Sequence, residues 1–374
     1  MSIINKHSPG DLKMMQSLPL DAKIALTQKR IEAWYESWKR YEIYNTKTDK
    51  TRYVTACEEP ALKDYEYIDS AADGQVYVSF SGGKDSTVLK HIVDSMYSDV
   101  PALFVNTGLE FPELQRFVRE VAEGIHECFN SDVNIVRPAI MFNEVLKTHG
   151  YPIVSKEVAQ IVREARIGLE RNDGSYSFRI QKLNGELRDK NGNLSQFNKK
   201  KWKFLLDADF RISEKCCTVM KKDPAKLYER ENGRRPLIAT MAAESALRKQ
   251  RWIRHGCNSF NESRPASNPM SFWTEQDVLE YIKRFNVPYA SVYGDIVETD
   301  KGLTTTGYSR TGCIFCAFGA HCESNPNRFQ MLKQTHPRQY DYCIGGGEMV
   351  DGKWQPSKEG LGLGRVLDYI GVDY

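Results

Sequence analysis

A short apolar strand at residues 76–80 is followed at once by a glycine-rich turn and then by a helical pattern that runs to about Met96. The turn reads Ser81-Gly82-Gly83-Lys84-Asp85-Ser86. Adjacent glycines allow a tight bend with exposed N–H groups, and a helix start adds unpaired N–H groups and partial positive charge. Lys84 adds a full charge, and the serines add hydroxyl donors. The alternative is an ordinary glycine turn, but the pattern favours a loop that holds phosphate.

The segments after this turn predict an α/β fold. Residues 101–106 and 133–136 have the apolar character of buried strands, and helical patterns separate them. Later helical patterns cover 240–254 and 274–285. Strands that alternate with helices predict a doubly wound, mostly parallel sheet with ligands at the carboxyl ends of its strands. We expect this nucleotide-binding α/β domain to span residues 73–300.

Two further regions flank or interrupt the predicted domain. Residues 1–72 have roughly helical apolar spacing and predict a helical N-terminal extension, while residues 301–374 form a cysteine-rich C-terminal region. Residues 166–203 carry ten Lys or Arg against four Asp or Glu. Turn signals such as Asn191-Gly192 predict that this segment is a β-hairpin insertion. It is either a solvated insertion or a basic arm that binds a polyanion such as DNA or RNA.

The cysteines favour a metal centre over disulfide bonds. The 374 residues include nine cysteines, an odd number that argues against a disulfide scaffold and for a reducing cytoplasm. No run of eighteen apolar residues predicts a membrane span, so we expect no membrane partner. Adjacent Cys216 and Cys217, together with Cys313 and Cys316, favour ligation of a 4Fe–4S cluster. A zinc site formed by Cys313, Cys316, Cys322 and Cys343 is the alternative.

The loop at residues 81–86 resembles the pyrophosphate loop of the N-type ATP pyrophosphatases. It lacks the spacing of the Gly-x-x-x-x-Gly-Lys-Ser/Thr loop of kinases and GTPases. Together with the two cysteine pairs, the loop makes the chain similar to the iron–sulfur branch of the adenylylsulfate (APS) and phosphoadenylylsulfate (PAPS) reductase superfamily. Residues 106–113, 242–248 and 272–279 resemble further segments of that superfamily.

This resemblance implies a set of site residues. Lys84, Asp85 and Arg248 are expected to be catalytic. Adenine nucleotide and Mg²⁺ are expected to be held near the carboxyl ends of the first two core strands. The residues implied there are Ser79, Ser81, Gly82, Gly83, Lys84, Asp85, Ser86, Asn106, Thr107, Gly108 and Glu110.

The chain also departs from the reductases. Those enzymes use a cysteine in a C-terminal Glu-Cys-Gly-Leu/Ile-His tail, whereas this sequence ends in Gly-Arg-Val-Leu-Asp-Tyr-Ile-Gly-Val-Asp-Tyr374. In this respect it more closely resembles the ATP-pyrophosphatase component of DNA phosphorothioation systems. We therefore expect ATP-dependent activation of an acceptor, pyrophosphate release and sulfur transfer, with a 4Fe–4S cluster.

Partners and alternative functions follow from the same features. The acceptor could be a nucleic acid bound through residues 166–203, and a sulfur-donor protein is a further expected partner. A sulfonucleotide reductase acting on APS or PAPS is the first alternative. A non-catalytic nucleotide- or nucleic-acid-binding module is the second.

Overall fold

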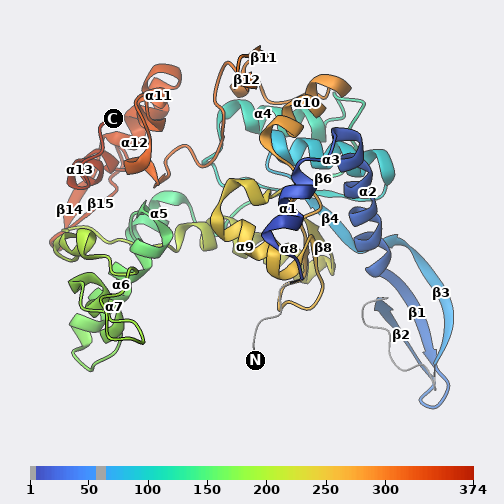
Figure 1. Cartoon of the computed structure of the whole chain (residues 1–374), viewed down its shortest axis with the longest axis horizontal. Helices are drawn as coiled ribbons and strands as arrows, with labels where there is room; N and C mark the ends of the chain where they lie inside the picture. The colour runs from blue at the N-terminus through green and yellow to red at the C-terminus, as the bar shows by residue number, and fades with distance from the viewer. Residues whose placement is uncertain (1–5, 56–64) are drawn as a thin grey trace. The chain divides into compact units, whose positions relative to one another are not determined.

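The computed structural model describes residues 6–55 and 65–374, which group into two compact units (Figure 1). The first unit contains residues up to 106 together with 111–136 and 225–311. The second contains 107–110, 137–224 and 312–374. These units do not follow the expected boundaries at 73–300 and 301–374. Segment 137–224 groups with the C-terminal region because β7 (Ile153–Val154) pairs in parallel with β13 (Ala317–Phe318).

A six-stranded sheet forms the centre of the first unit. Its strand order is β6-β5-β4-β8-β10-β9, and every pairing is parallel except that between β9 and β10. The strands are β4 (Val76–Ser79), β5 (Ala102–Val105), β6 (Val133–Val136), β8 (Arg235–Leu237), β9 (Asn258–Ser259) and β10 (Ala266–Ser267). The expected α/β class with a mostly parallel sheet is confirmed, as are strands at or near the predicted positions.

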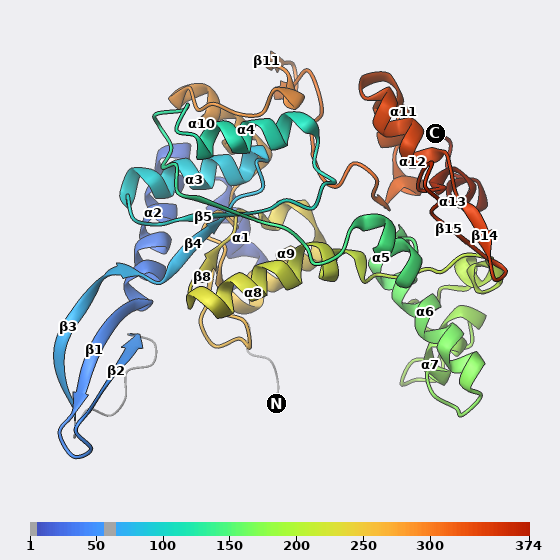
Figure 2. The same cartoon turned by 180° about the vertical axis from the view of Figure 1, so that it is seen from behind.

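Helices cover both faces of this sheet. The crossover helices are α3 (Lys84–Met96), α4 (Pro112–Ala122) and α8 (Asp223–Asn232), and α3 and α8 lie on opposite faces (Figures 1 and 2). Tyr77 and Leu103 alternate with residues that face the other way, and they pack with Tyr228 of α8 in one buried cluster. Val78, on the opposite face of β4, is fully buried. The apolar runs of β4 and β5 therefore reflect burial on both sides, as expected for parallel strands.

The remaining elements of the first unit surround the sheet. Helical patterns near 240–254 and 274–285 form α9 (Ala246–His255) and α10 (Glu275–Phe285). Thr274 caps α10, and Asp277 completes a capping box with it. The other elements are η4 (Ala242–Glu244), η5 (Ser291–Tyr293), β11 (Ile296–Thr299) and β12 (Gly302–Thr305), of which β11 and β12 pair antiparallel.

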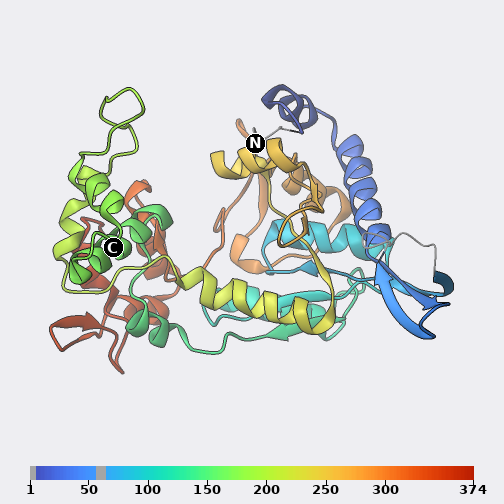
Figure 3. The same cartoon turned by 90° about the horizontal axis from the view of Figure 1, so that it is seen from below.

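The expected helical N-terminal extension is only partly helical. It begins with α1 (Pro9–Gln16) and α2 (Leu20–Ser37), but α2 then leads into a three-stranded antiparallel sheet (Figure 3). The strands are β1 (Lys39–Asn45), β2 (Lys50–Thr55) and β3 (Tyr65–Gly74). The prediction was wrong after Ser37, where the chain pairs as antiparallel strands and does not continue the helix. Ile43 of β1 and Val54 of β2 are buried. The part of the prediction that falls on residues 1–5 and 56–64 lies outside the described residues.

The second unit is mainly helical around a small core. Its principal helices are α5 (Phe142–Thr148), α6 (Lys156–Arg171), α7 (Ser177–Asn184), α11 (Arg328–Thr335), α12 (Pro337–Ile344) and α13 (Leu363–Tyr369). Shorter elements are η2 (Lys200–Asp207), the π-helical turn η3 (Thr218–Lys222), η6 (Ala320–Cys322), β14 (Glu348–Val350) and β15 (Lys353–Gln355). Tyr151 is fully buried, and its hydroxyl donates to the carbonyl of Leu361 across 2.8 Å. This bond joins two parts of the unit that are far apart in sequence.

Segment 166–203 is not the expected β-hairpin insertion. α6 ends at Asn172 and α7 ends at Gly185, both in the left-handed conformation. These residues act as helix C-caps, so the signals that we interpreted as hairpin turns terminate helices instead. A single antiparallel bridge, between Arg188 and Leu194, surrounds Asn191-Gly192. The burial of apolar residues at helical spacing on α6 outweighed the turn signals.

No helix within residues 6–55 and 65–374 has both the length and the apolar character that crossing a membrane requires.

Two ion pairs connect α2 to α10, and their burial predicts different contributions to stability. Lys23 Nζ lies 2.7 Å from Asp277, and the two side chains are 3% and 11% exposed. Arg284 pairs with Asp21 at the same distance, but those side chains are 46% and 72% exposed. We expect Lys23→Met to lower the free energy of unfolding by about 3–5 kcal/mol, because it strands a buried carboxylate. Arg284→Met should cost less than about 1 kcal/mol.

Urea denaturation monitored by circular dichroism measures both variants. Equal losses of unfolding free energy in the two variants would contradict the expectation that the buried pair contributes more to stability than the exposed pair.

Candidate nucleotide site and cysteine cluster

The loop after β4 bends through a left-handed glycine. Gly82 has φ of +73°, and a Cβ atom there would lie 2.9 Å from Cγ2 of Val118. Both conditions exclude a larger side chain without a shift of the backbone or of α4. Gly83 has extended backbone and is the N-cap of α3, so the first N–H groups of that helix follow directly. The sequence thus produces the predicted strand–loop–helix geometry.

Hydroxyl groups are the partners of three loop N–H groups. The N–H of Ser81 donates to Oγ of Ser86 over 3.1 Å, and that of Gly83 donates to Oγ of Ser81 over 3.4 Å. The N–H of Lys84 donates to the hydroxyl of Tyr293 over 3.2 Å. A phosphate at this loop would have to displace these hydroxyls, which can themselves turn to donate to its oxygens.

The side chain of Lys84 is buried, with only 4% of the residue exposed. Its ammonium group donates to the carbonyl oxygen of Ser309 over 2.8 Å and lies 3.1 Å from Oε1 of Glu275. Burial of an ammonium is costly unless it is paired, and these two oxygens provide the pairing. Sequence reasoning missed Glu275 and Ser309 as partners, although Glu275 lies in the predicted helix-start motif.

Asp85 carries an unsatisfied buried oxygen. Its Oδ1 is buried, has no hydrogen-bond partner among residues 6–55 and 65–374, and lies 4.0 Å from the Lys84 ammonium. Burial raises the pKa of Asp85, an effect that Lys84, Arg248 and Arg310 partly offset and Glu275 reinforces. A buried carboxylate oxygen without a hydrogen-bond donor suits an oxygen-preferring cation such as Mg²⁺.

Tyr293 closes one side of the loop. It is 2% exposed, and its hydroxyl lies 2.5 Å from Oγ1 of Thr311. Burial raises the pKa of Tyr293 to about 12, although its bonds to Thr311 and to the Lys84 N–H oppose the change. The hydroxyl therefore remains protonated near neutral pH. The sequence contained no motif that pointed to Tyr293 or Thr311.

Arg248 belongs to the same unit as the loop and is exposed at the start of α9. Burial of part of its side chain and the charge of Arg310 lower the pKa of Arg248, while Asp85 raises it. It also forms an ion pair with Glu244. Arg248 and Arg310 thus contribute positive charge that acts on Asp85.

The other residues predicted to contact nucleotide separate into two groups. Ser79 ends β4, and Asn106 follows β5 with its N–H donating to Val136, so both remain in the first unit. Thr107, Gly108 and Glu110 group with the cysteine-containing second unit. There Thr107 donates from its hydroxyl to Glu110 over 2.7 Å.

The two cysteine pairs come together in the second unit. Burial raises the pKa of Cys216, and the charges of Cys217, Cys313 and Cys316 raise it further. Burial also raises the pKa of Cys313 to about 11, partly offset by Lys221. All four thiols are close enough for their charges to influence one another. No three His, Cys, Asp or Glu side chains in the described parts of the chain are arranged as ligands of a single metal ion.

Lys221 is the charged neighbour of these thiols. Burial alone would lower its pKa, but Cys313, Glu110 and Cys217 together raise it. Its ammonium lies 3.8 Å from Oε1 of Glu110, which is itself 6% exposed. The π-helical turn at residues 218–222 carries Lys221 to this position, a local geometry that the sequence pattern did not reveal.

The alternative zinc ligands lie in different surroundings. Cys343 is fully buried within α12, and burial alone raises its pKa. Cys322 is exposed, with its sulfur 3.1 Å from Nε2 of His321. Neither Cys322 nor Cys343 is among the thiols whose charges act on Cys216, whereas Cys217, Cys313 and Cys316 are.

These features define an α/β protein with a mostly parallel sheet and a glycine-rich loop between its first core strand and the helix that follows. Consistent with this class, residues 75–167 and 169–318 match the phosphoadenosine phosphosulfate reductase domain. The chain belongs to this family, which confirms the predicted membership of the PAPS/APS reductase superfamily.

Individual relatives are distant. An adenosine 5′-phosphosulfate reductase of Bacillus cereus is 24% identical over 118 residues, which are 31% of this chain and 45% of that protein. An uncharacterized protein of Methanocaldococcus jannaschii is 32% identical over 284 residues, 76% of this chain and 50% of that protein. The chain spans about half the length of the curated relatives it matches. The phosphoadenylyl-sulfate reductase of Candida auris, solved with phosphate, has a TM-score of 0.32 and 18% identity, covering 58% of this chain and 75% of that one.

The raised pKa of Asp85 predicts a pH-dependent effect on the free energy of unfolding. Because the pKa of Asp85 is raised in the folded state, ionisation of this carboxyl group lowers the free energy of unfolding. The loss begins as pH rises through the ordinary pKa of 3.8 and is complete above the folded-state pKa. Asp85→Asn should therefore raise the thermal midpoint at pH 7, and the gain should shrink as pH falls towards 4. Differential scanning calorimetry at several pH values measures this.

Asp173→Asn is the control, because hydrogen bonds from Ser175 lower the pKa of that exposed carboxyl group. It should not raise the midpoint at pH 7. A gain for Asp85→Asn that is independent of pH would contradict the assignment of the penalty to its charge.

Proposed function

We propose that this protein binds ATP at the loop 81–86, activates an acceptor with release of pyrophosphate, and supports sulfur transfer with a 4Fe–4S cluster. The observation that carries the proposal is the buried Lys84 ammonium at the start of α3, beside loop N–H groups whose partners are exchangeable hydroxyls. Family membership supports nucleotide chemistry at this position.

The loop would act on the leaving group. An acceptor oxygen attacks the α-phosphorus, and the bond from that phosphorus to its bridging oxygen breaks, so that pyrophosphate departs with the electron pair. Lys84 and the freed N–H groups of residues 81–84 would offset the charge that develops on pyrophosphate. Arg248 and Arg310 would add positive charge for the phosphates, as their effect on Asp85 indicates.

Asp85 fits the magnesium ion that accompanies ATP. Its Oδ1 is buried without a hydrogen-bond donor, and a cation at this oxygen would remove the cost of leaving it unsatisfied. Lys84 would then offset the negative charge of the phosphates, and Asp85 would bind the positive magnesium ion.

Cys216, Cys217, Cys313 and Cys316 would hold the cluster as thiolates. Burial and the charges of neighbouring thiols raise the pKa of Cys216, Cys313 and Cys316, and binding to iron would relieve both effects. When bound, a 4Fe–4S cluster supplies a one-electron redox centre and links the segments that carry its ligands. Lys221, beside Cys313, would balance part of the negative charge of the four thiolates.

A sulfonucleotide reductase is the second candidate, favoured by the family and by the adenosine 5′-phosphosulfate reductases among its relatives. This reaction requires an accessible nucleophilic thiol. Cys343 is fully buried, so it is not placed to attack a substrate. Sulfite release from APS or PAPS in the presence of thioredoxin would favour this candidate over ATP-dependent activation.

Nucleic acid is the acceptor that we favour, bound through residues 166–203. Part of the positive charge of this segment is consumed internally, since Lys182 and Lys199 both pair with Glu157. Lys200, Lys201 and Lys203 remain exposed beside Trp202. A sulfur-donor protein is the further partner that the proposed reaction needs.

Replacement of Lys84 tests the proposed reaction. Lys84→Gln keeps a donor for Ser309 but removes the charge, so we expect ATP-dependent pyrophosphate release to fall by about 10²-fold or more. Pyrophosphate release is measured with a coupled phosphate assay against tRNA, DNA and small-molecule acceptors.

Lys249→Gln, on exposed surface of α9, is the matched control and should retain activity. Thermal unfolding of both variants verifies that they remain folded. Full activity in the Lys84 variant would remove the basis for placing ATP at this loop.

Replacement of a cysteine tests the cluster. Protein purified without oxygen should be brown, with absorbance at about 400 nm that Cys313→Ser strongly reduces. Iron and sulfide analysis should show a matching loss.

Cys128→Ser is the control, because Cys128 is exposed and belongs to the other unit. A colourless wild-type protein with stoichiometric zinc would show that the cysteines hold zinc instead.

A further inference from the structure

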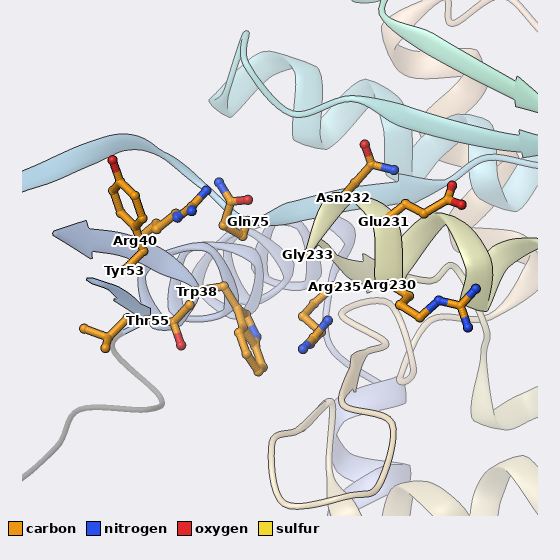
Figure 4. Close-up of a pocket in the computed structure, with 11 residues that line it drawn as sticks. Trp38, Arg40, Tyr53, Thr55, Gln75, Arg230, Glu231, Asn232, Gly233 and Arg235 are labelled. Atoms are coloured by element: carbon orange, nitrogen blue, oxygen red, sulfur yellow. The ribbon is translucent and has the colours of Figure 1, made fainter. Parts of the chain in front are cut away.

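A pocket of about 420 Å³ lies at the amino ends of β4 and β8 in the first unit (Figure 4). Gln75 immediately precedes β4, and Arg235 begins β8. The loop 81–86 follows the carboxyl end of β4, so the pocket and the loop lie at opposite ends of the same strand. The pocket volume falls within the range of roughly 300–1,000 Å³ that is typical of small-molecule sites.

Three polar atoms in the pocket-lining residues are buried and unsatisfied. They are Nε1 of Trp38, Oγ1 of Thr55 and Nε of Arg235, and none has a hydrogen-bond partner among the residues described. Trp38 is only 5% exposed. Buried polar groups are nearly always paired, so three unpaired atoms in residues that line one pocket indicate a missing partner, which would reach them after the side chains shift. The tryptophan and arginine atoms can only donate, and a hydroxyl can donate as well, so that partner carries acceptor oxygens.

The charged groups of the pocket indicate an anion. Arg235 stacks over Trp38 with its guanidinium carbon 4.9 Å from the ring centroid, and Arg40 stacks over Tyr53 at 4.0 Å. Figure 4 shows Arg235 beside Trp38, and Arg40 extending towards Gln75. A stacked guanidinium keeps its in-plane N–H donors for an oxyanion.

The balance of charge favours phosphate over a carboxylate. Arg230 adds a third positive charge to the lining, whereas Glu231 supplies its one negative charge. Each guanidinium group can donate two parallel N–H bonds, which match the several oxygens of a phosphate group. The net positive charge of the lining matches its larger negative charge. Tyr53, which is 53% exposed, offers an aromatic surface next to these donors.

We propose that this pocket binds the phosphate group of a nucleotide unit, with Arg40 and Arg235 as its charged contacts. Trp38 and Thr55 would donate to the phosphate oxygens, and Tyr53 would contact the organic part. The unit could be a free nucleotide or part of a single-stranded nucleic acid, since both present the same phosphate chemistry. This proposal is independent of the ATP reaction, because it uses no residue of the loop 81–86.

The test uses the full chain carrying Lys84→Gln, so that binding at the loop contributes least. The probes are adenosine monophosphate, measured by calorimetry, and fluorescein-labelled oligothymidylate of ten nucleotides, measured by anisotropy at several salt concentrations. We expect Arg40→Gln and Arg235→Gln each to weaken binding of at least one probe by about tenfold. Arg40 is exposed, so its replacement carries little risk to folding.

Arg338→Gln, an exposed arginine of α12, is the matched control and should leave both affinities unchanged. Losses confined to adenosine monophosphate would identify a free nucleotide as the occupant. Losses for oligothymidylate, with a reduced salt dependence, would identify a nucleic-acid backbone. The proposal is overturned if neither arginine variant changes either affinity, or if only replacement of Lys200, Lys201 and Lys203 weakens oligothymidylate binding.

Discussion

The buried ammonium group of Lys84 is the interaction on which the structure at the carboxyl end of β4 depends. It links the first turn of α3 to the carboxylate of Glu275 at the start of α10 and to the carbonyl of Ser309. Such a charge is stable in a nearly dry position only because two oxygens meet it there. The loop that places it requires Gly82 in a left-handed conformation against α4. A paired lysine, a left-handed glycine and a carboxylate oxygen without a hydrogen-bond donor therefore occur within four residues, a combination that folding alone does not favour but anion and cation binding would.

The elements nearest this loop were the ones that sequence reasoning located well. Val76–Ser79 and Ala102–Val105 are buried on both faces, so their apolar runs are continuous and distinct from the helical patterns around them. Regions with weaker or mixed patterns were predicted poorly. Asn172 and Gly185 looked like hairpin turns but end helices, because the same left-handed conformation serves both purposes. The strands after Ser37 depend on pairing with β3, a non-local contact that no short sequence window contains.

In the candidate site too, residues within short sequence motifs could be proposed from the sequence, whereas their partners from distant segments could not. The expectation that Cys216, Cys217, Cys313 and Cys316 hold one cluster stays a prediction, although the charges of the other three thiols act on Cys216 in the folded chain. The charged residues around them were not predicted, because Lys221 reaches Cys313 only through a π-helical turn. Tyr293 and Ser309 likewise meet Lys84 from more than 200 positions along the sequence. Their roles follow from the folded chain and have no motif of their own.

The two proposed anion sites in the first unit differ in how their donors are satisfied. Loop N–H groups have hydroxyl partners from Ser81, Ser86 and Tyr293, so a ligand there exchanges one set of hydrogen bonds for another. The donors of Trp38 and Arg235 have no partner within the described chain, and each such buried group costs about 1–3 kcal/mol. A phosphate at their pocket would remove this cost as well as add its own charge interactions. Exchange of hydroxyl partners for ligand oxygens suits the proposed role of the loop, which must bind and release nucleotide in each turnover. Donors that have no partner without a ligand suit a site whose occupant stays bound and stabilises the unit.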